Sequence, residues 1–218
     1  MTKVSFATYI TVQKSKYILG NFLLQRMFVL SSESLFESAI TQINALGLLR
    51  RAWFGGKAGI VARFTERAAQ LVEEKQILII QNLKSAVSNE GEENLARSLL
   101  NGKSTDVFCS RLLHDILGQD AYQGGLICQS IVGFHGRARK LFIDDITSLT
   151  SDELSQIFDT PPGSFLLEKM AKSIPDKKFI EIIKNFPFDK IAFGRFGSRA
   201  VEGTEFILIE HTPELFYD

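Results

Sequence analysis

The sequence contains little of what metal-binding, disulfide-bonded and membrane proteins require. Its 218 residues include only two cysteines, Cys109 and Cys128, and three histidines, and none of these stands at zinc-ligand spacing. We therefore predict no metal site and no cofactor, and we expect both cysteines to be thiols in the core of a protein from a reducing compartment.

Long apolar runs are also missing. The stretch between Gln76 and Gln81 contains four consecutive apolar residues, far fewer than the roughly 20 that a transmembrane helix needs. The amino terminus has one early lysine and no apolar segment leading to a cleavage site. We expect a protein that is neither inserted in a membrane nor exported.

An excess of charge of one sign is absent as well. Lysine plus arginine total 25, and aspartate plus glutamate total 25, so the formal net charge is zero. A protein that binds phosphate backbones nonspecifically carries a basic excess, because its affinity comes from counterion release. Any nucleic-acid binding by this chain is therefore expected to be local and directed at bases.

Motifs for catalysis are weak. Cys109, His114 and Asp115 are close in sequence, but neither a nucleophile turn nor an orienting group accompanies them. The segment 55–58 superficially resembles a phosphate loop, yet Ala58 stands where that loop requires Ser or Thr. We predict that the protein is not an enzyme.

Five short segments, called signatures here, repeat one polar pattern along the chain. Their first positions are separated by 38 (21 to 59), 66 (59 to 125), 39 (125 to 164) and 34 residues (164 to 198). Periods between about 20 and 50 residues indicate repeat architectures. The signatures are Asn21-Phe-Leu-Leu-Gln25, Gly59-Ile-Val-Ala-Arg63, Gly125-Leu-Ile-Cys-Gln129, Ser164-Phe-Leu-Leu-Glu168 and Ser198-Arg-Ala-Val-Glu202.

On a helix, the first, second and fifth positions of a signature lie within about 100° of one another, and the third, fourth and seventh point backwards. The rear positions are apolar in three signatures: Leu23, Leu24 and Met27; Ile127, Cys128 and Ile131; Leu166, Leu167 and Met170. Each such helix is expected to bury its rear against neighbouring repeats and to offer its front side chains to a partner.

The spacing predicts more than one helix in each repeat. The segment from Thr150 to Glu153 has the residue types of a capping box and should begin a short helix that ends near Phe158. The prolines of 159–163 should break it, so that Ser164 opens the next helix. A polar insertion is predicted near 86–105 and an atypical tail at 203–218.

In residue types and spacing, these units resemble Pumilio (PUF) repeats, a family in which each repeat contacts one RNA base. The resemblance implies an all-α, right-handed superhelix of about five three-helix repeats, forming a single solenoid over residues 1–218. It also implies that positions one and five contact the base edge and position two stacks on the base. The RNA-binding residues implied are Asn21, Phe22, Gln25, Gln129, Ser164, Phe165, Glu168, Ser198, Arg199 and Glu202.

Glycine precedes four of the signatures, at 20, 124, 163 and 197, and two signatures have the form Gly-Ser-x-x-x-Glu. This pattern is more specifically similar to the nucleolar Pumilio-like subfamily, and the chain resembles a fragment or short form of it. The similarity implies single-stranded pre-ribosomal RNA as partner, with pre-ribosomal proteins, and a role in small-subunit rRNA processing in the nucleolus of the nucleus.

Other interpretations of the same residues remain open at this stage. Ser164 and Ser198 have the residue type of helix N-caps, and Phe22 and Phe165 that of core aromatics. The basic run from His135 to Lys140 suits either a phosphate contact or a solvated helix start. For the whole chain, the alternative is a protein-binding scaffold of the armadillo or HEAT kind, which zero net charge would suit.

Overall fold

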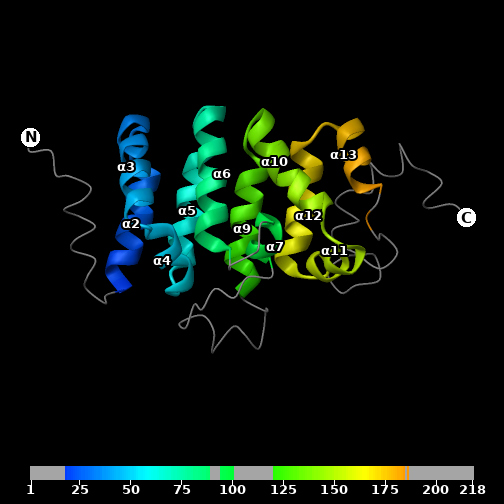
Figure 1. Ribbon diagram of the computed structural model, residues 1–218, viewed down its shortest axis with the longest axis horizontal. Coiled ribbons are helices and arrows are strands. Elements are labelled where there is room, and N and C mark those ends of the chain that lie inside the picture. Colours follow the sequence, from blue (N-terminus) through cyan, green and yellow to red (C-terminus); the bar gives the residue numbers. More distant parts are fainter. Residues whose placement is uncertain (1–17, 89–93, 101–119, 185, 187–218) are drawn as a thin grey trace, which may run out of the picture.

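The computed structural model describes residues 18–88, 94–100, 120–184 and 186. In these residues eleven α-helices pack together and no β-strand occurs, which confirms the predicted all-α class (Figure 1). In chain order the helices are α2 (Ile18–Leu30), α3 (Glu33–Ala45), α4 (Leu48–Phe54), α5 (Ala58–Ala68), α6 (Glu73–Val87), α7 (Leu95–Leu100), α9 (Asp120–Val132), α10 (Gly136–Thr147), α11 (Ser151–Phe158), α12 (Pro161–Ser173) and α13 (Asp176–Ile183).

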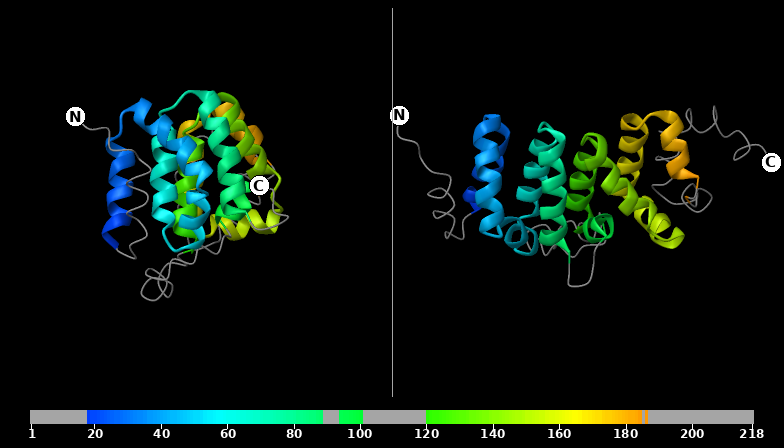
Figure 2. Two further views of the ribbon diagram at one scale, coloured as in Figure 1. Left: turned by 60° about the vertical axis from the view of Figure 1, so that its left-hand side comes forward. Right: turned by 45° about the horizontal axis from the view of Figure 1, so that its top comes forward.

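The helices form successive units in which the same three kinds of helix follow one another. A short helix (α4, α7 or α11) is followed by a helix that contains a signature (α5, α9 or α12) and then by an outer helix (α6, α10 or α13), and the pair α2 and α3 precedes them. The four signature helices α2, α5, α9 and α12 pack side by side in chain order. The units follow one another along the long axis of the molecule, with the short helices at one edge (Figures 1 and 2).

Two helix starts show how local sequence sets the unit boundaries. The Thr150 hydroxyl accepts a hydrogen bond from the Glu153 amide while the Glu153 carboxylate accepts one from the Thr150 amide, so the predicted capping box is confirmed. The prediction that Ser164 opens the next helix is wrong. α12 starts three residues earlier because Thr160 caps it and both prolines occupy its first turn, where amides need no helical partner.

The glycine before a signature has a packing function in two units. A Cβ atom at Gly124 would lie 1.8 Å from the carbonyl oxygen of Leu99, and one at Gly163 would lie 1.9 Å from that of Ile157. Leu99 and Ile157 are each the penultimate residue of the short helix in their unit. Glycine therefore lets the short helix approach the backbone of its signature helix in the same way in both units.

The rear positions of the signatures form much of the core. In α9 and α12 all six predicted rear residues are fully buried, as expected: Ile127, Cys128, Ile131, Leu166, Leu167 and Met170. In α2 the prediction holds for Leu24 and in part for Met27, but it is wrong for Leu23, which is 47% exposed. Among the described residues α2 has a neighbour in the row of signature helices on one side only, so its other flank stays open.

Polar side chains join consecutive units at their turns. Gln76, fully buried near the start of α6, donates to the Leu71 carbonyl (2.9 Å) of its own unit and accepts from the His135 amide (2.7 Å) of the next. Arg139 holds the same place in α10 and donates to the carbonyls of Phe134 (2.8 Å) and Ser173 (2.7 Å). These bonds connect each unit to the next one in the row.

The range of the predicted insertion, near 86–105, is described only in part by the structure. That range contains the end of α6 and all of α7, the short helix of its unit, which Asn94 caps by accepting from the Arg97 amide (2.8 Å). Residues 89–93 and 101–119 lie outside the described residues, as does the predicted tail at 203–218.

Candidate nucleic-acid interface

The second signature position projects outward on the first and last of the described signature helices. Phe22 in α2 is 62% exposed and Phe165 in α12 is 48% exposed, so neither is a core aromatic. The neighbouring rear residues Leu24 and Leu166 are buried, and this anchors each helix with its front free. A phenyl ring held in solvent by a packed helix is a flat apolar surface on which a planar ligand can stack.

The fifth signature position is accessible as well. Gln25, Gln129 and Glu168 are each partly exposed, on α2, α9 and α12. The Glu168 carboxylate pairs with the Lys172 ammonium one turn later on the same helix face. Gln25 lies against α5, where its amide nitrogen would be 3.2 Å from a Cβ atom at Gly59. An amide or a carboxylate therefore stands beside the second position in three of the four units.

The first position behaves differently from the prediction. Ser164 is only 5% exposed, and its hydroxyl donates to the Pro161 carbonyl (2.9 Å) inside α12. It is thus neither an outward base contact nor an N-cap, because the helix begins earlier and Thr160 is the cap. Burial follows from close packing of α9 on the first turn of α12, where a Cβ atom at Gly125 would lie 2.3 Å from Pro162.

Four other predicted site residues are not placed by the structure. Asn21 belongs to the backbone of α2, but its side chain lies outside what the structure describes, and Ser198, Arg199 and Glu202 lie outside the described residues altogether. Of the predicted site residues, Phe22, Gln25, Gln129, Phe165 and Glu168 thus keep exposed or partly exposed side chains on the described signature helices.

The signature Gly59–Arg63, which the sequence pattern predicts for α5, begins three residues too early. At the carboxyl end of α5 the Leu71 amide bonds the Ala68 carbonyl (3.0 Å), as the Phe134 amide bonds the Ile131 carbonyl (2.9 Å) after α9. Each residue of the second turn stands 63 positions after its counterpart in the first. The same offset relates the bond from the Gln70 amide to the Arg67 carbonyl (3.3 Å) to the bond from the Gly133 amide to the Ser130 carbonyl (3.0 Å). It also relates Gln76 to Arg139, which join consecutive units.

Ala62 stands 63 residues before Gly125, the first position of the signature in α9. Ala62, and not Gly59, is therefore the first signature position in α5. Burial agrees: Ile60, which the sequence placed second, is buried, whereas Arg63 and Glu66 are exposed. The rear positions of the shifted signature are Phe64, Thr65 and Ala68, and all three are fully buried. The structural signature of α5 is therefore Ala62-Arg-Phe-Thr-Glu66.

A signal for this alignment is present in the sequence. Arg63 and Glu66 stand three apart, as Arg199 and Glu202 do in the last signature, and each pair would hold positions two and five. Glycine at the first signature position has no side chain to bury or expose, so the signature that begins at Gly59 carries little information on the helix face.

With the signature of α5 aligned in this way, the second and fifth positions of the four described signature helices define one set of equivalent residues. Its second positions are Phe22, Arg63, Leu126 and Phe165, and its fifth positions are Gln25, Glu66, Gln129 and Glu168. All eight side chains are partly or fully exposed. We call these eight residues the signature face.

The basic run 135–140 is largely occupied by structural contacts. Arg139 bridges two units, Ala138 is buried, and the Lys140 ammonium pairs with Asp144 (2.6 Å). Arg137 keeps an exposed side chain, but its amide bonds the Glu73 carboxylate (2.6 Å). The run is the start of α10 packed against α6, so its interpretation as a helix start is the one that the structure favours.

Of the two cysteines, the structure describes Cys128. Burial raises the pKa of its thiol well above the usual value, so it stays protonated and enclosed in the core.

Within the parts of the chain that the structure describes, no three His, Cys, Asp or Glu side chains gather as metal ligands. In the same parts, every helix is too short or too polar to cross a bilayer.

Comparison with known proteins gives no match from which a function could be carried over. No protein-family description, no curated protein sequence and no solved structure matches it. The signature face must therefore be interpreted from its own geometry.

Proposed function

We propose that the protein binds single-stranded RNA, without catalysis, by placing successive bases against the signature face. The observation that carries the proposal is the repetition of a flat group beside an amide or carboxylate on three of the four described signature helices: Phe22 with Gln25, Arg63 with Glu66, and Phe165 with Glu168. Helices that pack side by side offer these pairs in a fixed order.

The pairs suit unstacked bases for physical reasons. Aromatic rings and guanidinium planes stack on the faces of bases, and amides or carboxylates exchange hydrogen bonds with base edges. Such recognition needs a base that is not already stacked and paired, as in a single strand. In the third unit the second position is Leu126, whose aliphatic side chain binds a base more weakly than a planar group does. We therefore expect α9 to contribute to RNA binding mainly through Gln129.

Charge sets the limits of the proposed interaction. The net charge is zero, but exposed cations flank the signature face at Arg26 in α2 and at Lys169 and Lys172 in α12. A few phosphate contacts would position the strand, while the base contacts would supply specificity.

The resemblance to Pumilio repeats extends the proposal to a right-handed superhelical solenoid and to a biological setting. In that setting the partner is pre-ribosomal RNA, and the protein acts in the nucleolus in maturation of the small subunit. These parts of the proposal rest on the sequence pattern, with the successive three-helix units in support.

Binding of fluorescent single-stranded RNA oligonucleotides tests the proposal. Replacing both Phe22 and Phe165 by Ala should weaken binding by about 1–3 kcal/mol for each lost stack. Leu78→Ala is the matched control, because Leu78 is a comparably exposed apolar residue on the outer helix α6, and it should leave affinity unchanged. Melting temperatures of the variants check that both still fold.

Two results would contradict the proposal. One is equal affinity of the double variant and the wild type for every RNA that binds. The other is the absence of RNA binding combined with capture of a protein partner through the same face, which would favour the scaffold alternative.

A further inference from the structure

Exposed apolar side chains concentrate on the first two of the described helices. Nine large apolar side chains are exposed among the residues that the structure describes, and six of them belong to α2, α3 or the C-cap of α3: Phe22, Leu23, Val29, Leu30, Leu35 and Leu46. Apolar patches of this kind mark contacts with other molecules. We infer that one side of this helix pair binds a second copy of the chain, so that the protein forms a two-fold symmetric dimer. The inference goes beyond RNA binding and does not depend on it.

The composition of α2 is that of a helix enclosed by neighbours. Arg26 is its single charged residue, and apolar residues occur all around its axis. A helix that is apolar all round normally has packing partners on every side. Among the described residues, α5 covers one flank of α2, and Phe28 packs against Phe36 of α3 with ring centroids 5.8 Å apart. The opposite flank of α2 therefore has the residue types for a further packing partner.

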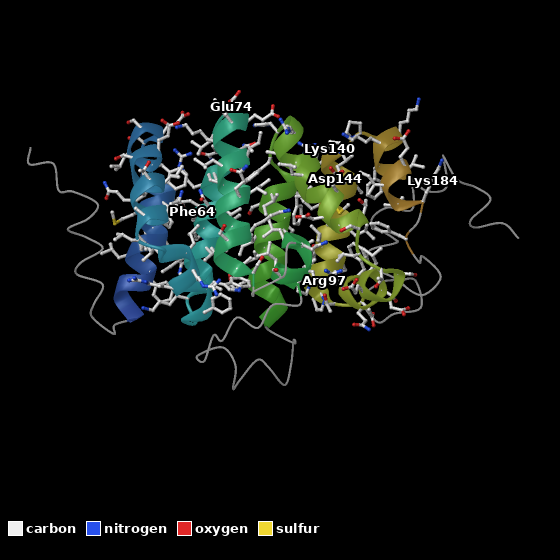
Figure 3. All side chains as sticks on the ribbon, in the orientation of Figure 1. Phe64, Glu74, Arg97, Lys140, Asp144 and Lys184 are labelled. Carbon is white, nitrogen blue, oxygen red and sulfur yellow. The ribbon has the colours of Figure 1, made fainter. Side chains whose placement is uncertain are left out.

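The third signature position shows what kind of partner suits this flank. In α5 this position is Phe64, which is fully buried and packs against Phe28 of the preceding signature helix, α2, with ring centroids 5.7 Å apart (Figure 3). In α2 the same position is Leu23, which is 47% exposed. A helix placed beside α2 would cover Leu23 as α2 covers Phe64.

Three apolar residues of α2 form a seam that can pack against its own copy. Leu23, Met27 and Leu30 are separated by four and three residues, so they lie within about 60° of one another on the helix. Leu23 stands about 160° from Gln25, which lies against α5, so the seam faces away from the next unit. Spacings of four and three are those of coiled-coil seams, in which the apolar residues of one helix fill the gaps between those of the other. An identical chain supplies an identical seam.

The helix α3 extends the seam into a patch. The Glu37 carboxylate lies 3.9 Å from the Lys75 ammonium of α6, so this side of α3 faces the next unit. Leu35 stands about 160° from Glu37, and Leu46 about 180°, so both face the same way as the seam. Figure 1 shows α2 and α3 together at one end of the described row. We call these five residues the end patch: Leu23, Met27, Leu30, Leu35 and Leu46.

Charge favours a second copy as the occupant of the end patch. A two-fold contact brings the patch against itself, so a patch with charge of one sign would repel its own copy. All five residues of the end patch are uncharged, and Arg26, the single charge of α2, stands about 40° from Leu30 on the side towards Phe22. The zero net charge of the chain also removes long-range repulsion between copies. The end patch is thus complementary to itself.

Sedimentation velocity of the whole chain at rising protein concentration tests the inference. The wild type should change from one chain to two per particle as the concentration rises, because patches on two helices form a small, reversible interface. The double variant Leu23→Glu with Leu30→Glu should dimerise at least about a hundredfold more weakly, because carboxylates would meet across the two-fold axis. The double variant Leu23→Lys with Leu30→Lys should be equally weak alone. An equimolar mixture of the two double variants should regain dimers, because opposite charges then meet.

The matched control is Val72→Glu with Leu78→Glu, since Val72 and Leu78 are comparably exposed (55% and 42%) but belong to α6 and its N-cap. This variant should dimerise as the wild type does, and melting temperatures check that every variant folds. A wild type that remains a single chain at every concentration would overturn the inference, and so would a dimer that both charged double variants retain. Neither result involves RNA, so failure here is distinguishable from failure of the proposed function.

Discussion

At the scale of single residues, glycines in and beside the signatures have different roles. Gly163 and Gly124 are packing residues, because a carbonyl of the preceding short helix occupies the space that a Cβ atom would take. Gly59 is different, since the nearest atom to its missing Cβ is the end of the flexible Gln25 side chain. Residues that look equivalent in sequence thus respond to different neighbours.

Substitution of these glycines should have opposite effects. Gly163→Ala places a Cβ atom 1.9 Å from the Ile157 carbonyl oxygen, so the two helices must separate, and the free energy of unfolding should fall by about 1–3 kcal/mol. Gly59→Ala should be neutral or stabilising, because alanine favours the helix and the Gln25 side chain can move away. Urea denaturation measures both variants. Equal stability of Gly163→Ala and the wild type would contradict the packing role.

At the scale of helices, the units are joined by polar contacts as well as by the core. The Arg97 guanidinium of α7 donates to the Glu153 carboxylate of α11 (2.6 Å), the same carboxylate that completes the capping box. Arg97 and the Thr150 amide together lower the pKa of Glu153 from 4.5 to about 2. One side chain therefore starts a helix and attaches it to the preceding unit.

Stability should depend on pH through this contact. A pKa that is lower in the folded than in the unfolded state stabilises the fold above about pH 4.5, and this contribution is lost as pH falls from 4.5 towards 2. Glu153→Gln should therefore lower the free energy of unfolding at pH 7, and the difference from wild type should shrink between pH 4.5 and 2. Denaturation across this range measures it, with Glu181→Gln, an exposed carboxylate on α13, as control. A difference that stays constant with pH would refute the assignment.

At the scale of the whole molecule, the described part of the row of units begins at α2. The third signature position is buried in every other described signature helix, at Phe64, Ile127 and Leu166, but it is exposed at Leu23. Leu30 and Leu35 are exposed on the same pair of helices, α2 and α3. Position within the row, and not residue type, decides whether these side chains are buried.

The neutral charge of the molecule predicts weak salt dependence of RNA binding. Among the residues that the structure describes, four cations lie on or beside the signature face, at Arg26, Arg63, Lys169 and Lys172, so these four release about four counterions when RNA binds. Their contribution to the slope of log affinity against log salt should therefore be about −3 for single strands. Lys169→Ala should reduce the slope by about 0.7, whereas Lys178→Ala on the outer helix α13 should not change it. A slope near about −6 would mean that phosphates, and not bases, dominate binding.

Local patterns in the sequence were enough to predict much of the fold. Apolar spacing predicted helices and the buried rear of α9 and α12, and the residue types at Thr150 and Glu153 predicted a helix start, because both depend on interactions within a few residues. The outward positions of Phe22 and Phe165 followed from the same periodicity. RNA binding and the nucleolar role stay predictions.

Other features depend on neighbours that are distant along the chain. The burial of Ser164, the exposure of Leu23 and the true register of α5 were all set by the packing of one unit on the next. A periodic pattern states which residues share a helix face, but it does not state which face the adjacent helices will cover. The order of amino acids was thus sufficient for the helices and their apolar sides. The packing of the units selected which polar side chains meet solvent on a common face, because burial is a property of the packed assembly.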